Sequence, residues 1–269
     1  MRIMPAMREV KQFTLDVVDS KVRGTLSRPD TNGDDKRCAA ILMCDGLAAP
    51  NPFTDELFEH LTDALHRVGI ATLTFGPCNQ DSNGQATERL AVEAIDASSA
   101  VFRWLALQEN IDLNRLGVLG FSLGGIVAAC LAKRTDQIAK LCLLAPTTPD
   151  DVIAHLSSNG EGESAPLLGV EQASLYYFAD LKNLSPAQDL AIYDRPTLIL
   201  HGAADRAVPA EISFEYSRAI ELAEHNVQHT LIAFADHFFS QQPGRGMCLD
   251  HIARFFEAMG QTSELAESS

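Results

Sequence analysis

The pentapeptide Gly120-Phe121-Ser122-Leu123-Gly124 stands where a run of apolar residues ends and a helical pattern begins. Residues 115–121 are typical of a short, fully buried strand, and residues 125–132 of a helix with small side chains on the face nearest the sheet. The backbone must turn sharply between them, and the two glycines let neighbouring backbone pass close to the serine. Because such an elbow lifts the hydroxyl above the sheet edge, we expect Ser122 to be a nucleophile.

Strand and helix patterns alternate along the rest of the chain. Two segments, residues 10–18 and 21–26, are expected to open it as an antiparallel hairpin. Six further strands are expected, at residues 39–44, 70–75, 115–121, 138–145, 197–201 and 230–234. Helices are expected at residues 52–68, 87–107, 125–132, 210–224 and 247–259. Parallel strands need a crossover long enough to hold a helix, so we predict an α/β fold with a mostly parallel eight-stranded sheet and helices on both faces.

A small insert, residues 147–193, follows the sixth strand and breaks this rhythm. It is either a lid at the carboxyl edge of the sheet or a surface excursion that does not touch substrate. Its aromatic trio, Tyr176, Tyr177 and Phe178, suits core packing or an apolar pocket. We expect one domain over residues 1–269, with residues 261–269 as a frayed polar tail.

Composition excludes several classes of partner. The 36 acidic and 21 basic residues give a formal charge of −15 without any basic block, which argues against nucleic acid. No run of about 18 apolar residues suggests a membrane span, and the amino terminus lacks the apolar stretch of a signal peptide. The six cysteines are scattered through apolar runs and are expected to be buried thiols, so we predict a cytoplasmic protein.

A serine hydroxyl needs an imidazole to take its proton and a carboxylate to orient that imidazole. Asp205 follows an apolar strand and a glycine-containing turn. In isolation it would be a structural turn residue, but its place past a strand's carboxyl end favours the orienting role. His237 directly follows the last strand, where a loop could bring it over the elbow. Its neighbour Asp236 is a poorer partner because adjacent residues rarely face one another. By strand alternation, His201 is expected to point into the sheet layer and to support the Asp205 loop.

The oxyanion of an acyl-transfer reaction calls for two further donors. One is expected to be the amide of Leu123, directly after the serine, and the other that of Leu47, in the loop after residues 39–44. The alternative for the second loop is an ordinary turn between strand and helix. Five other histidines are expected to pack or to face solvent: His60, His66, His225, His229 and His251.

With these residues assembled, the chain resembles the α/β-hydrolase superfamily over about residues 14–256. It is most similar to single-domain esterases, dienelactone-hydrolase-like proteins and serine aminopeptidase-like hydrolases, through residues 120–125, 200–209 and 235–239. The resemblance implies Ser122 as nucleophile, Asp205 as acid and His237 as base, with no cofactor and no metal.

Two positions depart from the pattern of these relatives. Asp45 stands where a histidine often precedes the glycine, and we expect it to point away from the oxyanion or to contact substrate. Residues 76–84 replace a turn that often contains Arg-Gly, which leaves the specificity open.

The leading hypothesis is a serine hydrolase of small-molecule carboxylic esters. A thioester, or a small peptide or amide, is the alternative substrate, since the same residues serve all acyl transfers. A non-catalytic ligand-binding member of the fold, with Asp45 closing the oxyanion site, is the alternative class. Halide chemistry fits worse, because dehalogenation normally uses a carboxylate as the nucleophile.

Overall fold

The computed structural model describes residues 8–17, 20–30, 37–45, 52–76, 91–157 and 180–261. Its strands form a single eight-stranded sheet in the order β1-β2-β4-β3-β5-β6-β7-β8. The strands are β1 (Glu9–Val17), β2 (Ser20–Arg28), β3 (Cys38–Cys44), β4 (Ile70–Phe75), β5 (Ile111–Phe121), β6 (Ile138–Leu144), β7 (Thr197–Gly202) and β8 (Val227–Ile232). The α-helices are α1 (Pro52–Arg67), α2 (Ala91–Ala106), α3 (Leu123–Arg134), α4 (Pro149–Ser157), α5 (Pro186–Leu190), α6 (Ile212–Leu222) and α7 (Gly244–Gly260).

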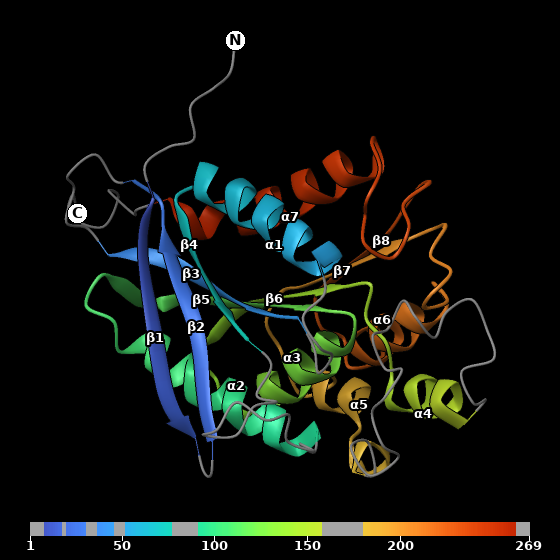
Figure 1. The fold of residues 1–269 in the computed structure, drawn as a ribbon. Helices are drawn as coiled ribbons and strands as arrows, with labels where there is room; N and C mark the ends of the chain where they lie inside the picture. The colour runs from blue at the N-terminus through green and yellow to red at the C-terminus, as the bar shows by residue number, and fades with distance from the viewer. Residues whose placement is uncertain are drawn as a thin grey trace.

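The sheet is antiparallel at one edge and parallel elsewhere (Figure 1). β1 pairs with β2, and β2 with β4, in antiparallel register, whereas every pairing from β4 through β3 to β8 is parallel. This arrangement confirms the predicted α/β-hydrolase fold and its mostly parallel eight-stranded sheet. The parallel order places the carboxyl ends of β5, β7 and β8 at the same edge, where loops from distant parts of the sequence can meet.

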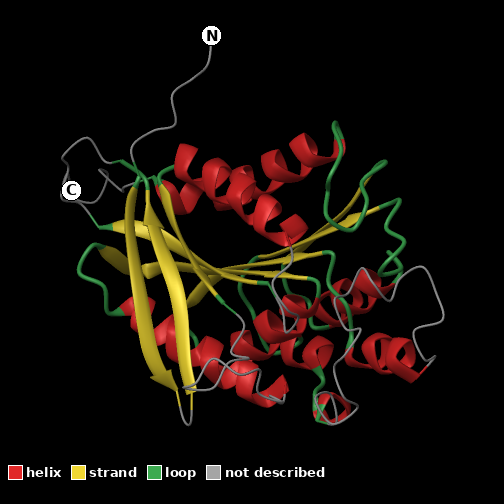
Figure 2. Cartoon of the chain, viewed as in Figure 1, coloured by secondary structure: helices red, strands yellow, loops and turns green. Residues whose placement is uncertain are grey.

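Helices cover both faces of the sheet (Figure 2). α1 and α7 pack together on one face, while α2, α3, α5 and α6 form a contiguous layer on the other. The central strand β5 feeds both cores: Leu116 and Val118 belong to one buried cluster, and Leu119 and Phe121 to the other. Burial on both faces explains why this strand reads as a continuous apolar run.

Two strands, β5 and β8, begin three or more residues before the expected position, whereas the bounds of the other strands agree within two residues. β5 begins at Ile111, four residues before the apolar run that predicted it. Residues 112–115 of this strand are half-buried or exposed, so they carry no apolar signal. β8 spans Val227–Ile232 rather than residues 230–234. It is an edge strand, and only Ile232 at its end is fully buried, so its first half carries no continuous apolar signal. Phe234, with φ 60°, already lies in the following turn.

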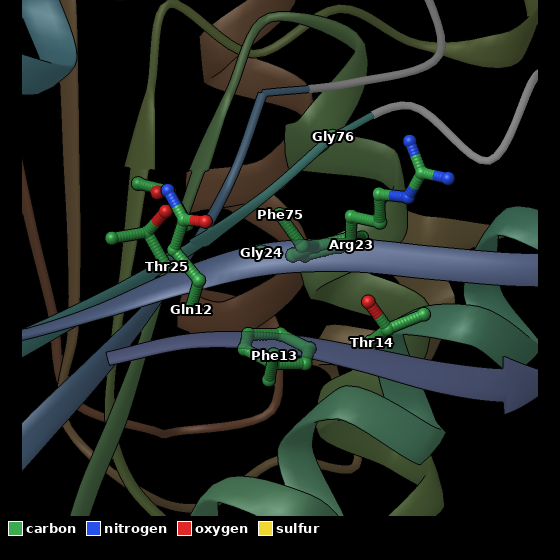
Figure 3. A pocket seen from close by; sticks show the side chains of 9 residues that line it. Gln12, Phe13, Thr14, Arg23, Gly24, Thr25, Phe75 and Gly76 are labelled. Atoms are coloured by element: carbon green, nitrogen blue, oxygen red, sulfur yellow. The ribbon is translucent and has the colours of Figure 1, made fainter. Parts of the chain in front are cut away.

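The antiparallel edge carries a surface hollow of about 430 Å³ (Figure 3). Phe13 on β1 lies opposite Gly24 on β2, and a Cβ at Gly24 would meet the Phe13 ring at 2.5 Å. The ring stacks on Trp104 of α2 at a centroid distance of 4.2 Å, which ties the hairpin to the helical layer. The polar residues that line the hollow are Gln12, Thr14, Arg23, Thr25 and Thr74. The hollow lies over β1, β2 and β4, and β3 separates it from β5, the strand that leads to Ser122.

The insert after β6 is described at its two ends, where α4, a 3-10 turn (Leu181–Asn183) and α5 lie. The aromatic trio at 176–178 and residues 262–269 fall outside the described residues. Within the described part, no helix has the length and apolar character that crossing a bilayer requires. The cysteines that the structure describes are free and buried, as expected: Cys38, Cys44, Cys130, Cys142 and Cys248.

Candidate active site

The turn after β5 holds Ser122 in an unusual backbone conformation. Its φ of 54° and ψ of −120° lie in a region that non-glycine residues rarely adopt, and such positions are kept only where the surrounding structure enforces them. α3 begins at the next residue. A Cβ at Gly120 would lie 2.6 Å from the Cβ of Ala128 and would overlap the carbonyl oxygen of Gly124, while a Cβ at Gly125 would lie 2.8 Å from Pro146. The glycines therefore allow β5, α3 and the end of β6 to close around the serine.

Three side chains from distant segments meet at this turn. The Oγ of Ser122 lies 3.0 Å from Nε2 of His237, and Nδ1 of His237 lies 2.7 Å from Oδ2 of Asp205. Ser122 and His237 are only 7% and 3% exposed, so both hydrogen bonds are sheltered from water. The structure thus brings together the three residues that the sequence singled out, and two consecutive hydrogen bonds connect Ser122, His237 and Asp205 in that order.

Asp205 follows β7 and is held by four donors. Its Oδ1 accepts hydrogen bonds from the backbone amides of Ala207 at 2.8 Å and Val208 at 2.9 Å. Its Oδ2 accepts from His237 and also lies 3.1 Å from Nε2 of His201. Burial alone would raise the pKa of the Asp205 carboxyl, but the donors outweigh it: the His201 and His237 hydrogen bonds, the His237 charge and the Val208 amide hold that pKa well below its ordinary value. The group is consequently an ionised acceptor at neutral pH.

His237 is positioned by the loop that follows β8. Its ring lies 5.0 Å from the centroid of Phe121 and 5.1 Å from that of Phe238. The adjacent carboxylate of Asp236 turns away, because it accepts hydrogen bonds from the amide and hydroxyl of Ser240. Asp236 therefore stabilises its own loop, and the carboxylate that orients His237 is Asp205.

Gly202, the glycine of the turn before Asp205, has a packing role that the sequence did not indicate. A Cβ there would lie 2.8 Å from the carbonyl oxygen of Asp236 and would overlap that of Ala235. Only glycine lets the end of β7 approach the loop that carries His237 so closely. The available signal was its position, at the end of a strand and three residues before Asp205.

The first expected oxyanion donor, the amide of Leu123, lies at the start of a helix. Leu123 is the first residue of α3, so its N–H has no helical carbonyl to bond, and it sits at the positive end of the helix dipole. Leu47 falls outside the described residues.

Asp45, directly after β3, lines a cavity of about 460 Å³ beside Asp55 and Phe58 of α1. Burial, and secondarily the charge of Asp55, raises the pKa of the Asp45 carboxyl to about 7. The described residues that contact the Ser122 hydroxyl do not include it.

Other histidines bond elsewhere. His66 contacts the carbonyl of Ser27 at 3.1 Å, and His229 contacts the hydroxyl of Ser213 at 2.8 Å. His60 lies 2.8 Å from Arg245. Among the described residues there is no group of three or more His, Cys, Asp or Glu side chains placed to hold a metal ion.

A protein-family model matches residues 83–262, about two thirds of the chain, and its description is the prolyl oligopeptidase family. The chain belongs to the prolyl oligopeptidase family. The matched segment contains Ser122, Asp205 and His237. Membership identifies the chain as a hydrolase of the α/β-hydrolase superfamily and supports a serine-dependent activity.

Known proteins similar to this chain include peptidases, esterases and an uncharacterized protein. An uncharacterized protein of Mycobacterium tuberculosis is 26% identical over 255 residues, which is 94% of this chain and 80% of that protein. The structure of Est1E from Butyrivibrio proteoclasticus has a TM-score of 0.71 at 18% identity, over 92% of this chain and 98% of that one. The acylaminoacyl peptidase of Pyrococcus horikoshii has a TM-score of 0.70 at 14% identity, over 97% of this chain and 43% of that one. At these identities the structural likeness establishes the fold.

Proposed function

We propose that this protein hydrolyses carboxylic esters through an acyl-enzyme on Ser122, with His237 as general base and Asp205 as the carboxylate that orients it. The observation that carries the proposal is the hydrogen-bonded line from the Ser122 hydroxyl through both nitrogens of His237 to Asp205, at 3.0 and 2.7 Å. An ionised carboxylate can only accept, so Nδ1 of His237 carries the hydrogen and Nε2 presents a lone pair to the serine.

The chemistry follows from this tautomer. The Oγ of Ser122 attacks the acyl carbon while Nε2 of His237 takes its proton, and the resulting imidazolium is stabilised by Asp205. The same nitrogen returns the proton to the leaving alcohol, whose bond to the acyl carbon breaks. A water molecule, activated by His237, then releases the acid and restores the serine. The amide of Leu123 is placed directly beside the nucleophile, where it can donate to the oxyanion, a contribution of about 3 kcal/mol for one such donor.

The test uses an activated ester panel of graded acyl length and a fluorophosphonate probe. We expect a burst of product equal to the enzyme concentration, turnover after it, and covalent labelling at Ser122. Ser122→Ala should abolish all three, whereas Ser217→Ala, at a buried serine of α6 that bonds a backbone carbonyl, should keep them. Equal labelling of the wild type and Ser122→Ala would refute the role of Ser122, and no labelling of the wild type would favour a non-catalytic member of the fold.

A peptide or amide substrate is the second candidate, and family membership is what favours it. An acylaminoacyl peptidase is also among the similar structures. Matched esters, thioesters and anilides of one acyl group separate the possibilities, because the acyl-enzyme is the same and only the leaving group differs. We expect the ester to have the highest kcat/KM; a higher value for the anilide would assign the protein to peptide or amide hydrolysis.

A further inference from the structure

We propose that His201 is a positioning residue of this site: by donating a second imidazole hydrogen bond to Oδ2 of Asp205, it limits how strongly Asp205 stabilises protonated His237, and so sets the pH at which the site becomes active. This inference rests on the proposed function, since it concerns the base of the same reaction. It goes beyond the support of a loop, because it assigns His201 an electrostatic effect on a different side chain.

The geometry places two imidazoles on one oxygen. Nε2 of His201 lies 3.1 Å from Oδ2 of Asp205, and Nδ1 of His237 lies 2.7 Å from the same atom. His201 reaches it from the end of β7 and His237 from the loop after β8. The side chains of His201 and Asp205 are both 0% exposed, and that of His237 is 4% exposed, so water does not screen the arrangement.

The hydrogen of His201 is fixed by its partners. Nε2 also lies 3.1 Å from the carbonyl oxygen of Val208, so both groups facing this nitrogen are acceptors. Nε2 must therefore be the donor. Nδ1 is buried and has no hydrogen-bond partner within the described part of the chain, so a second hydrogen there would be a buried donor without an acceptor. The ring thus keeps one hydrogen, on the side of Asp205.

A fixed N–H pointing at Oδ2 puts the positive end of a dipole beside the oxygen that His237 uses. This dipole favours ionised Asp205, and it acts more strongly when His237 is neutral than when the His237 imidazolium already neutralises the carboxylate. Removing it should make protonated His237 more favourable. The acidic limb of the rate profile, below which His237 is protonated and cannot act as base, should then move to higher pH.

The other ionisable groups around the pair do not supply the same effect. His229 of β8 contacts the hydroxyl of Ser213, and burial, followed by the influence of His201, lowers its pKa. Asp236 is engaged by Ser240, and Arg206 is exposed. Within the described residues, the side-chain donors to Asp205 are the two histidines.

The experiment compares two variants that differ in one donor. His201→Gln keeps an N–H near the position of Nε2, whereas His201→Leu fills the space without one. We expect the acidic limb of the kcat/KM profile to move upward by about one pH unit in His201→Leu, which is about a tenfold lower kcat/KM at pH values below the limb. In His201→Gln the limb should stay close to its wild-type position. His201→Asn, whose amide is too short to reach Oδ2, provides the same comparison if the leucine variant does not fold.

A second readout does not need turnover. The ring of His237 in protein labelled with ¹⁵N at histidine is titrated by NMR in the wild type and in each variant, with Ser122→Ala as the reference for an inactive site. A higher titration midpoint for His237 in the leucine variant supports the inference even if no ester is hydrolysed, which separates it from the proposed function. Unchanged midpoints and limbs, with only a uniform loss of kcat in both variants, would show that His201 merely braces the loop and would overturn the inference.

Discussion

Replacing Asp205 by asparagine is the sharpest perturbation of the proposed site, because it changes one charge and almost no volume. The Oδ1 position is fixed by the amides of Ala207 and Val208 at 2.8 and 2.9 Å, so the asparagine oxygen is expected to face them. The new amide nitrogen then occupies the place of Oδ2, where the N–H groups of His201 and His237 point. The N–H groups of His201 and His237 would then both point at another N–H donor, which cannot accept a hydrogen bond from either of them.

His237 is the imidazole that can change its tautomer, because the hydrogen on Nε2 of His201 is also bonded to the carbonyl oxygen of Val208. If His237 moves its hydrogen from Nδ1 to Nε2, it accepts from the new amide but points a donor at Ser122, 3.0 Å away, and can no longer take the serine proton. We expect kcat/KM to fall by about 10³- to 10⁴-fold, or roughly 4 to 5.5 kcal/mol at 1.36 kcal/mol per factor of ten. Hydrogen bonds to a charged acceptor become neutral ones, so stability should fall by about 2 kcal/mol.

The assay is kcat/KM for an activated ester at pH 8, together with urea unfolding of the same samples. Asp236→Asn is the matched control, since its carboxylate lies next to His237 in sequence but bonds Ser240. It should stay within a few-fold of the wild type. A folded Asp205→Asn protein with less than a tenfold loss, or a control that loses as much, would refute the assignment of Asp205.

Two further substitutions test the packing and the electrostatics. Gly120→Ala should lower the free energy of unfolding by about 2 to 4 kcal/mol, because its Cβ would meet that of Ala128 at 2.6 Å within a closed turn. Gly246→Ala in α7 is the control: its Cβ would meet only the end of the flexible Gln242 side chain, so the loss should stay within about 1 kcal/mol. Urea unfolding followed by the fluorescence of the single tryptophan measures both, and equal losses would contradict the close-approach argument. Asp45 has its pKa raised to about 7 in the folded protein, above the unfolded value near 3.9, so the folded state binds more protons and stability should fall as pH rises from about 4 to about 7. Asp45→Asn should remove this slope and be about 2 to 4 kcal/mol more stable than the wild type at pH 8 but not at pH 4; parallel pH profiles of unfolding would exclude the effect.

Patterns in the sequence predicted the order of strands and helices because each is a local property. The apolar run before Ser122 and the small residues after it identify a buried strand and a packed helix without knowledge of any neighbour. β8 was misplaced for the converse reason: at the edge of the sheet only its last residue, Ile232, is fully buried, and pairing with β7 determines where the strand begins. Gly202 likewise becomes meaningful only once a second chain segment lies against it.

The sequence alone determined the alternation of strands and helices, and it indicated a serine, an aspartate and a histidine that each follow a strand. Composition and periodicity suffice for that, because burial preferences and turn chemistry act over a few residues. Tertiary structure alone decided that one oxygen of Asp205 serves two imidazoles, that Asp236 turns to Ser240, and that Asp45 faces α1. Ser122 and His237 are 115 residues apart, and their contact depends on strand order and on close approaches that long-range packing creates.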